Sequence, residues 1–132
     1  MAETQAAPTT GTFCWNELGT KDLETARSLL TNLFGWRSDE RDMGPDGKYT
    51  VFNAGDRMVA GMYELKGERF RNVPTHWMSY VAVTNADVTA KSAERLGMKI
   101  QIPVTPIPEV GRFAVFTHPA IGMIAILEPA QG

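Results

Sequence analysis

The sequence predicts an α+β fold in which two βαβββ modules follow each other along the chain. The same order of strand-forming and helix-forming segments occurs in both halves. Trp15 and Trp77 are 62 residues apart, and so are Gly35 and Gly97. A repeat of this kind is typical of duplication, because a four-stranded half has a face that it cannot bury alone. We therefore expect a cupped, mostly antiparallel pair of sheets with the helices outside.

The first module is expected over residues 11–65. A strand over 13–18 leads to a helix over 22–34, with Asp22 as the N-cap and Gly35 as the left-handed residue that ends it. Further strands are expected from Trp36, over 49–54 and over 58–65. Asp46-Gly47 and Gly55-Asp56 have the composition of turns, and they are expected to connect these strands.

The second module is expected over residues 76–130, after a polar linker over 66–75. A strand over 76–84 precedes a helix over 85–96 that Asn85 caps and Gly97 ends. Strands are then expected over 98–103, 112–117 and 123–127. Prolines disfavour a regular ladder, so residues 103–108 are expected to be extended loop.

Composition excludes several classes of function. The chain of 132 residues is 43% apolar and carries a net charge of −2, which is typical of one globular domain and does not attract nucleic acid. Its one cysteine, Cys14, cannot form an internal disulfide, which favours a reducing, cytoplasmic location. Residues 1–10 are expected to form a flexible tail rather than a signal peptide, and no apolar window is long enough to span a membrane.

The chain resembles the vicinal oxygen chelate superfamily, which includes glyoxalase I, bleomycin-resistance proteins and extradiol dioxygenases. Fragments in matching order and spacing carry this resemblance: Trp15-Asn16-Glu17-Leu18, Leu33-Phe34-Gly35-Trp36, Val59-Ala60-Gly61-Met62, Gly111-Arg112-Phe113-Ala114-Val115, His118-Pro119 and Ile124-Ala125-Ile126-Leu127-Glu128-Pro129. His118-Pro119 departs from the family, which usually has Asp-Pro at that turn. The resemblance implies a cavity between curved sheets, often with a divalent metal.

The resemblance also implies where that metal would be held: by a His on the first strand of each module and a Glu on the last. The corresponding positions here are Trp15, Met78, Ala125 and either Val59 or Ala60, none of which is a metal ligand. We therefore expect that the chelate has been lost and that the protein has no metal cofactor.

Side-chain alternation predicts which residues face the cup. If Leu18 packs toward the first helix, Trp15 and Glu17 point the opposite way, and the same reasoning applied to the second module turns Tyr80 to the cup. The cup is then mostly apolar and aromatic, as small-molecule pockets are. The predicted ligand-binding residues are Trp15, Glu17, His76, Met78, Tyr80, Arg112 and Met123, with Glu17 and Tyr80 as candidate catalytic residues.

Alternatives remain open at three of these positions. Glu17 is either a general acid or base with a raised pKa or the partner of an arginine such as Arg112. Glu17 and His76 together would supply two ligands for a divalent metal, which is few for a tight site. Arg112 either binds an anionic ligand group or lies on the surface beside Glu109.

Three functions compete at this point. The first is a metal-independent binding domain for an apolar or aromatic compound. The second is a divalent-metal-dependent lyase, isomerase or dioxygenase that uses Glu17 and His76. The third is a protein-interaction module. We further expect a homodimer, because Trp36, Phe70 and Trp77 are aromatic residues in positions that suggest exposure.

Overall fold

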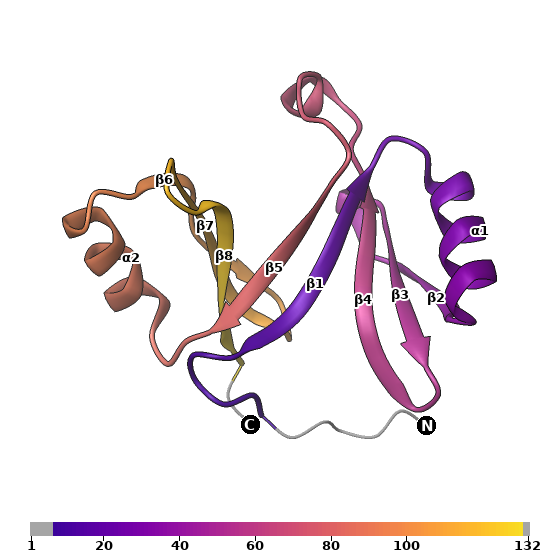
Figure 1. Ribbon diagram of the computed structural model, residues 1–132, viewed down its shortest axis with the longest axis horizontal. Coiled ribbons are helices and arrows are strands. Elements are labelled where there is room, and N and C mark those ends of the chain that lie inside the picture. Colours follow the sequence, from indigo (N-terminus) through magenta and orange to yellow (C-terminus); the bar gives the residue numbers. More distant parts are fainter. Residues whose placement is uncertain (1–6, 131–132) are drawn as a thin grey trace. The chain divides into compact units, whose positions relative to one another are not determined.

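The computed structural model describes residues 7–130, apart from the side chain of Asp46, and contains the two predicted βαβββ modules in tandem (Figure 1). The chain divides into two compact units, which we call the first half (Trp15–Trp77) and the second half (residues 7–14 and 78–130). The first strand of each half begins two residues before the unit boundary. The α+β class and the duplicated order of elements are confirmed. No helix among residues 7–130 is long and apolar enough to cross a membrane.

The first half is a four-stranded sheet with one long helix. Its elements are β1 (Phe13–Thr20), α1 (Leu23–Phe34), β2 (Arg37–Asp42), β3 (Lys48–Ala54) and β4 (Arg57–Glu64), with short 3-10 turns at Gly44–Asp46 and Glu68–Phe70. The strand order is β2-β3-β4-β1. The β1 and β4 strands are parallel, while the β2–β3 and β3–β4 pairs are antiparallel.

The helix α1 begins and ends where the sequence predicts. The Asp22 carboxylate accepts a hydrogen bond from the Thr25 amide at 3.1 Å, which satisfies one of the unpaired amides of the first turn. Gly35 follows the helix with φ at 70°, a left-handed conformation that glycine adopts without steric cost.

The core of the first half lies between the sheet and α1. The buried residues Leu18, Phe52, Ala60 and Met62 form one cluster, against which α1 packs Leu23, Ala26 and Leu30. Leu18 therefore faces the helix, as alternation predicts. Because successive side chains of a strand point to opposite faces, the neighbouring Glu17 lies on the face of the sheet that α1 does not cover.

The second half repeats this arrangement. Its elements are β5 (His76–Ala82), α2 (Ala86–Arg95), β6 (Lys99–Ile107), β7 (Gly111–His118) and β8 (Gly122–Pro129), in the sheet order β5-β8-β7-β6. The β5 and β8 strands are parallel, and the other pairs are antiparallel. The core cluster contains Ala86, Ala90 and Ala93 of α2 with Ala114, Phe116 and Ile126 of the sheet.

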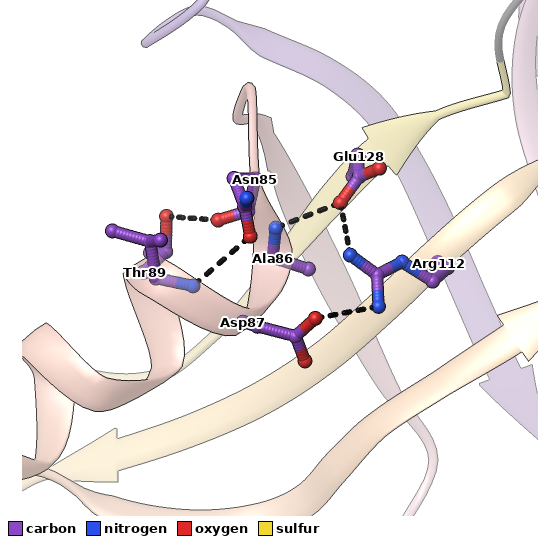
Figure 2. A network of polar contacts seen from close by, with 7 residues as sticks. Asn85, Ala86, Asp87, Thr89, Arg112 and Glu128 are labelled. Carbon is purple, nitrogen blue, oxygen red and sulfur yellow. Dashed lines mark hydrogen bonds and ion pairs between the residues drawn. The ribbon is translucent and has the colours of Figure 1, made fainter.

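A polar network ties the start of α2 to the sheet (Figure 2). The Asn85 side chain accepts a hydrogen bond from the Val88 amide, so the predicted N-cap is confirmed. Arg112 donates to Asp87 at 2.8 Å and to Glu128 at 2.6 Å, and Glu128 also accepts from the Ala86 amide at 2.8 Å. The guanidinium is thus bound by two carboxylates on the helix side of the sheet, and we assign Arg112 a structural role.

We predict that Glu128→Gln lowers the melting temperature at pH 7 and that this difference disappears in acid. The Ala86 amide and the Arg112 guanidinium hold the pKa of Glu128 below its usual range. A carboxylate with a lowered folded pKa stabilises the fold above the unfolded pKa of about 4.3 and loses that effect as the pH falls through the folded value.

Thermal melts of wild type and Glu128→Gln at pH 7 and pH 3 measure this difference. The control is Glu94→Gln, which makes the same charge change at an exposed position on α2. An equal loss at both pH values would contradict the role of the charge.

Two predicted segments differ in the structure. Residues 103–108 were expected to be loop, but β6 continues to Ile107 and pairs irregularly with β7, with register shifts between Ile100 and Thr105. The strand tolerates its prolines because it lies at the edge of the second-half sheet. The turn expected at Asp46-Gly47 is longer, because Gly44–Asp46 form a 3-10 turn and the Met43 amide donates to the Gly47 carbonyl.

The N-terminal segment is described from residue 7 onward. The Thr12 amide and hydroxyl both donate to the Thr9 carbonyl, and Thr10 is hydrogen-bonded to Thr84 at 3.1 Å. The rest of the predicted tail, residues 1–6, lies outside the described residues.

Candidate functional site

The face of the first-half sheet that α1 does not cover carries a cluster of aromatic side chains around one carboxylate. We call Trp15, Glu17, Tyr49 and Tyr63 the Glu17 cluster. The Trp15 indole donates to the Tyr49 hydroxyl at 3.0 Å, and that hydroxyl donates to Glu17 at 2.8 Å. All four side chains are half-buried. The cluster is therefore partly open to solvent while its polar atoms are held in fixed directions.

Strand register brings these residues together. Glu17 of β1 lies beside Gly61 of β4, and Gly61 lies opposite Val51 of β3. Tyr49 and Tyr63 are directly opposite each other in the β3–β4 pair. Three neighbouring strands thus present the cluster on one face.

Gly61 makes room for the Tyr49 phenol. A Cβ atom on residue 61 would overlap the hydroxyl and the outer ring carbon of Tyr49. A glycine inside a strand often marks such a close approach. The absence of a side chain at Gly61 therefore lets Tyr49 reach across β4 to the carboxylate of Glu17.

The electrostatics of the cluster keep both phenols neutral. Burial raises the pKa of Tyr49 well above its usual range, and the Glu17 charge raises it further. Burial and the Glu17 charge also raise the pKa of Tyr63, while the charge of Arg69 acts in the opposite direction. Tyr49 therefore serves as a hydrogen-bond donor to Glu17 rather than as a base.

The other predicted site residues lie outside the Glu17 cluster. His76 is half-buried, with Nδ1 2.8 Å from the Pro74 carbonyl oxygen. Met78 is buried and Met123 is exposed. Tyr80 is 7% exposed, and its ring centroid lies 6.4 Å from that of Phe113. The predicted ligand-binding residues that the structure joins by described hydrogen bonds are Trp15 and Glu17, through Tyr49.

The residues at the positions implied by the resemblance do not fit a divalent metal. Trp15 presents an indole N–H that donates to Tyr49, and an indole N–H is a donor only. The register of the second half places Tyr80 beside Ala125, which puts the apolar Met78 level with Met123. Within residues 7–130, no three His, Cys, Asp or Glu side chains are grouped so as to hold a metal.

The three aromatic residues expected to be exposed differ in how far they are buried. Trp36 was expected at the surface, but it packs on the core, with its ring 5.5 Å from that of Phe52. Phe70 is half-buried, 6.0 Å from the Tyr63 ring. Trp77 is 50% exposed and borders an apolar groove of about 360 Å³ along α1. The homodimer stays a prediction, with Trp77 as its remaining aromatic contact.

Comparison with known proteins identifies the family. The family model described as Glyoxalase/Bleomycin resistance protein/Dioxygenase superfamily matches residues 12–123. The chain belongs to this superfamily. It is 36% identical over 121 residues to the protein named "Putative glyoxylase CFP32" from Mycobacterium bovis, which covers 92% of this chain and 45% of that protein.

More distant similarities agree with the superfamily assignment. The chain is 28% identical to the anthracycline biosynthesis protein DnrV of Streptomyces peucetius, over 93% of this chain and 48% of DnrV. The crystal structure of the Mn(II)-bound glyoxalase from Novosphingobium aromaticivorans has 16% identity and a TM-score of 0.58, over 90% of this chain and 39% of that one. The chain thus spans less than half the length of the curated relatives it matches, and only the fold is carried over from the solved structure.

Sequence reasoning missed Tyr49, Tyr63 and Gly61. The strands that carry Tyr49 and Tyr63 were predicted to within about a residue at each end. Alternation alone, however, does not distinguish these two tyrosines from the other aromatic residues on strands. The signal that was present is Gly61, an isolated glycine inside the predicted strand over 58–65. The residue that fills the space at Gly61 can be identified only from the register of the strands in three dimensions.

Proposed function

We propose that this chain binds an apolar or aromatic small molecule on the Glu17 cluster and that it does so without a bound metal. The observation that carries the proposal is the chain of hydrogen bonds from Trp15 to Tyr49 and from Tyr49 to Glu17. Trp15, an aromatic residue, occupies a position where the resemblance implies a metal ligand. An aromatic surface with a few oriented polar groups is typical of sites for organic ligands. The cytoplasmic location proposed from the sequence is compatible with this role.

Binding, rather than catalysis, is the function that these contacts support. Burial raises the pKa of the Cys14 thiol, which disfavours the nucleophilic thiolate, and Tyr49 already donates its proton in a hydrogen bond to Glu17. One relative is named as a glyoxylase and another for anthracycline biosynthesis. Because this superfold hosts many activities, we extend to this chain only an organic ligand and no reaction.

A metal-dependent lyase, isomerase or dioxygenase using Glu17 and His76 is the competing function. It requires these two side chains to converge on one ion, with further ligands from elsewhere. The described contact of the His76 Nδ1 is instead the Pro74 carbonyl, which is two residues away in sequence.

The test is a thermal-shift screen of organic compounds, with and without divalent metals. A compound present at 100 times its Kd stabilises the native state by about 2.7 kcal/mol, which raises the melting temperature by several degrees. We expect at least one aromatic compound to do so in the presence of a chelator. Trp15→Ala is expected to abolish that shift.

Trp77→Ala is the matched control, since it removes an exposed tryptophan outside the Glu17 cluster. It should leave the shift unchanged. Purified protein should contain no stoichiometric Zn, Ni, Fe or Mn, and chelators should leave the melting temperature of the free protein unaltered. A metal bound by Glu17 and His76 would overturn the proposal in favour of the enzyme.

A further inference from the structure

The helix α1 carries large apolar side chains on a second face, beside the face that packs on the core. Leu29, Leu33 and Phe34 are each more than half exposed, and Trp77 of β5 is 50% exposed. No residue of α1 is fully buried. Single exposed apolar residues are ordinary on protein surfaces, but several gathered in one place indicate a surface that another molecule covers.

Three of these side chains line the apolar groove of about 360 Å³ along α1, namely Leu29, Leu33 and Trp77. Leu18 and Leu30 also line it and are less exposed, so they form its floor. An apolar cavity of about 150 Å³ is enough to hold one benzene ring. The groove is therefore large enough to receive leucine or aromatic side chains of a protein partner.

Charge is concentrated at one end of this surface. Among the described residues that line the groove, Asp22 alone is charged, and it caps the start of α1. The last turn of α1 has no basic residue and instead contains the exposed Leu33 and Phe34. A lysine or arginine there would interact favourably with the helix dipole. Exposed apolar residues in its place favour contact with protein over contact with water.

A second copy of this chain fits the surface when the two α1 helices run in opposite directions. A two-fold contact sets the same surface of both copies against each other. Because α1 has 12 residues and is about 18 Å long, an antiparallel contact keeps the two Asp22 carboxylates at opposite ends. Each carboxylate then lies beside the uncharged end of the other helix, and the two helix dipoles attract.

The relatives give an independent reason for a neighbour of this size. The matched region is 45% of the Mycobacterium bovis protein and 48% of DnrV, so more than half of each of those chains lies outside it. That length is sufficient for a second unit of the same size in one chain. For the present chain, a second copy is the neighbour of equal size.

From these observations we propose that the groove along α1 is the contact surface of a homodimer in which the α1 helices of the two copies pack antiparallel. Thr25 and Leu33 are each four positions from Leu29, so Leu29 lies near the two-fold axis and Leu33 of one copy packs beside Thr25 of the other. This inference gives the expected homodimer a surface and an orientation. It does not depend on ligand binding, because the groove lies on the helix side of the sheet.

Leu33→Glu tests the surface in sedimentation equilibrium, which measures the dissociation constant of the dimer. We expect wild type at about 100 μM to have twice the mass of one chain, as a specific interface allows. Leu33→Glu should weaken the dimer by about a hundredfold or more, because two-fold symmetry brings two unpaired carboxylates into an apolar contact. Circular dichroism checks that each variant keeps its fold.

Leu96→Glu is the matched control. Leu96 is 78% exposed and follows Asn85, the N-cap of α2, by the same number of positions as Leu33 follows Asp22. It should leave the dissociation constant unchanged. A wild type that stays monomeric, or two glutamate variants that dissociate equally, would overturn the proposal.

Thr25→Lys added to the Leu33→Glu chain tests the orientation. In an antiparallel contact the two substituted positions of opposite copies face each other, so the added lysine should restore at least about tenfold of the lost affinity. Failure to restore it would contradict the antiparallel contact. In the unaltered chain, dilution should shift the indole N–H signal of Trp77 and leave that of Trp15 in place, and the reverse pattern would place the interface elsewhere.

Discussion

Gly61→Ala should destabilise the protein by about 3 kcal/mol, which is a large fraction of the total stability of a small domain. The new methyl group would overlap the hydroxyl and outer ring of Tyr49, so the ring must leave its position. The hydrogen bonds that join Tyr49 to Trp15 and Glu17 are then lost, at about 1 kcal/mol each. Urea denaturation measures the free energy of unfolding.

A double-mutant cycle isolates the contact between Gly61 and Tyr49. In a Tyr49→Val background, which keeps a strand-forming residue without the ring, Gly61→Ala should cost less than about 1 kcal/mol. Gly19→Ala is a matched glycine on the neighbouring strand, where the nearest atoms are side-chain ends at 3.0 Å, so it should cost less than Gly61→Ala. The same cost for Gly61→Ala in both backgrounds would show that Tyr49 does not fill this space.

Gly111→Ala should destabilise the protein by on the order of 3 kcal/mol or more, the sum of backbone strain and overpacking. Gly111 has φ at 145°, a conformation that other residues rarely adopt. A Cβ atom there would overlap the backbone carbonyl oxygen of Glu128, which cannot rotate away as a side chain can. Movement of Glu128 would also disturb its contacts with Ala86 and Arg112 (Figure 2).

Gly122→Ala is the control for strain without overlap. Gly122 also has positive φ, at 74°, but an added Cβ would meet open space. We expect it to cost about 1 kcal/mol. If the two alanine variants were equally stable in urea denaturation, the close approach of Gly111 to Glu128 would not matter for the fold.

The sequence predicts most of the fold because its signals are local. Asp22 and Asn85 cap the two helices through hydrogen bonds to residues three positions away, and both were found from residue type and spacing. Gly35 ends α1 by its own backbone freedom. The error at residues 103–108 arises because an edge strand tolerates prolines, and edge position is not a local property.

The candidate site was predicted only in part for the same reason. Alternation along β1 placed Trp15 and Glu17 on one face correctly, since it needs only the direction of Leu18. Tyr49 is 32 residues from Glu17 in sequence, and its contact depends on the register of three strands. For Arg112 the sequence left ligand binding and a surface position open, and its partners Asp87 and Glu128 come from α2 and β8, which local patterns do not bring together.

The indole N–H signal of Trp15 offers the most direct test of metal-independent ligand binding at the Glu17 cluster. The chain has three tryptophans, each with one indole N–H that a nitrogen–proton correlation spectrum reports, and that of Trp15 donates to Tyr49. We predict that titration with the compound found by the screen, in the presence of a chelator, shifts the Trp15 signal and leaves that of Trp77 in place. Saturating binding that leaves the Trp15 signal unmoved, or binding that the chelator abolishes, would contradict the proposed site.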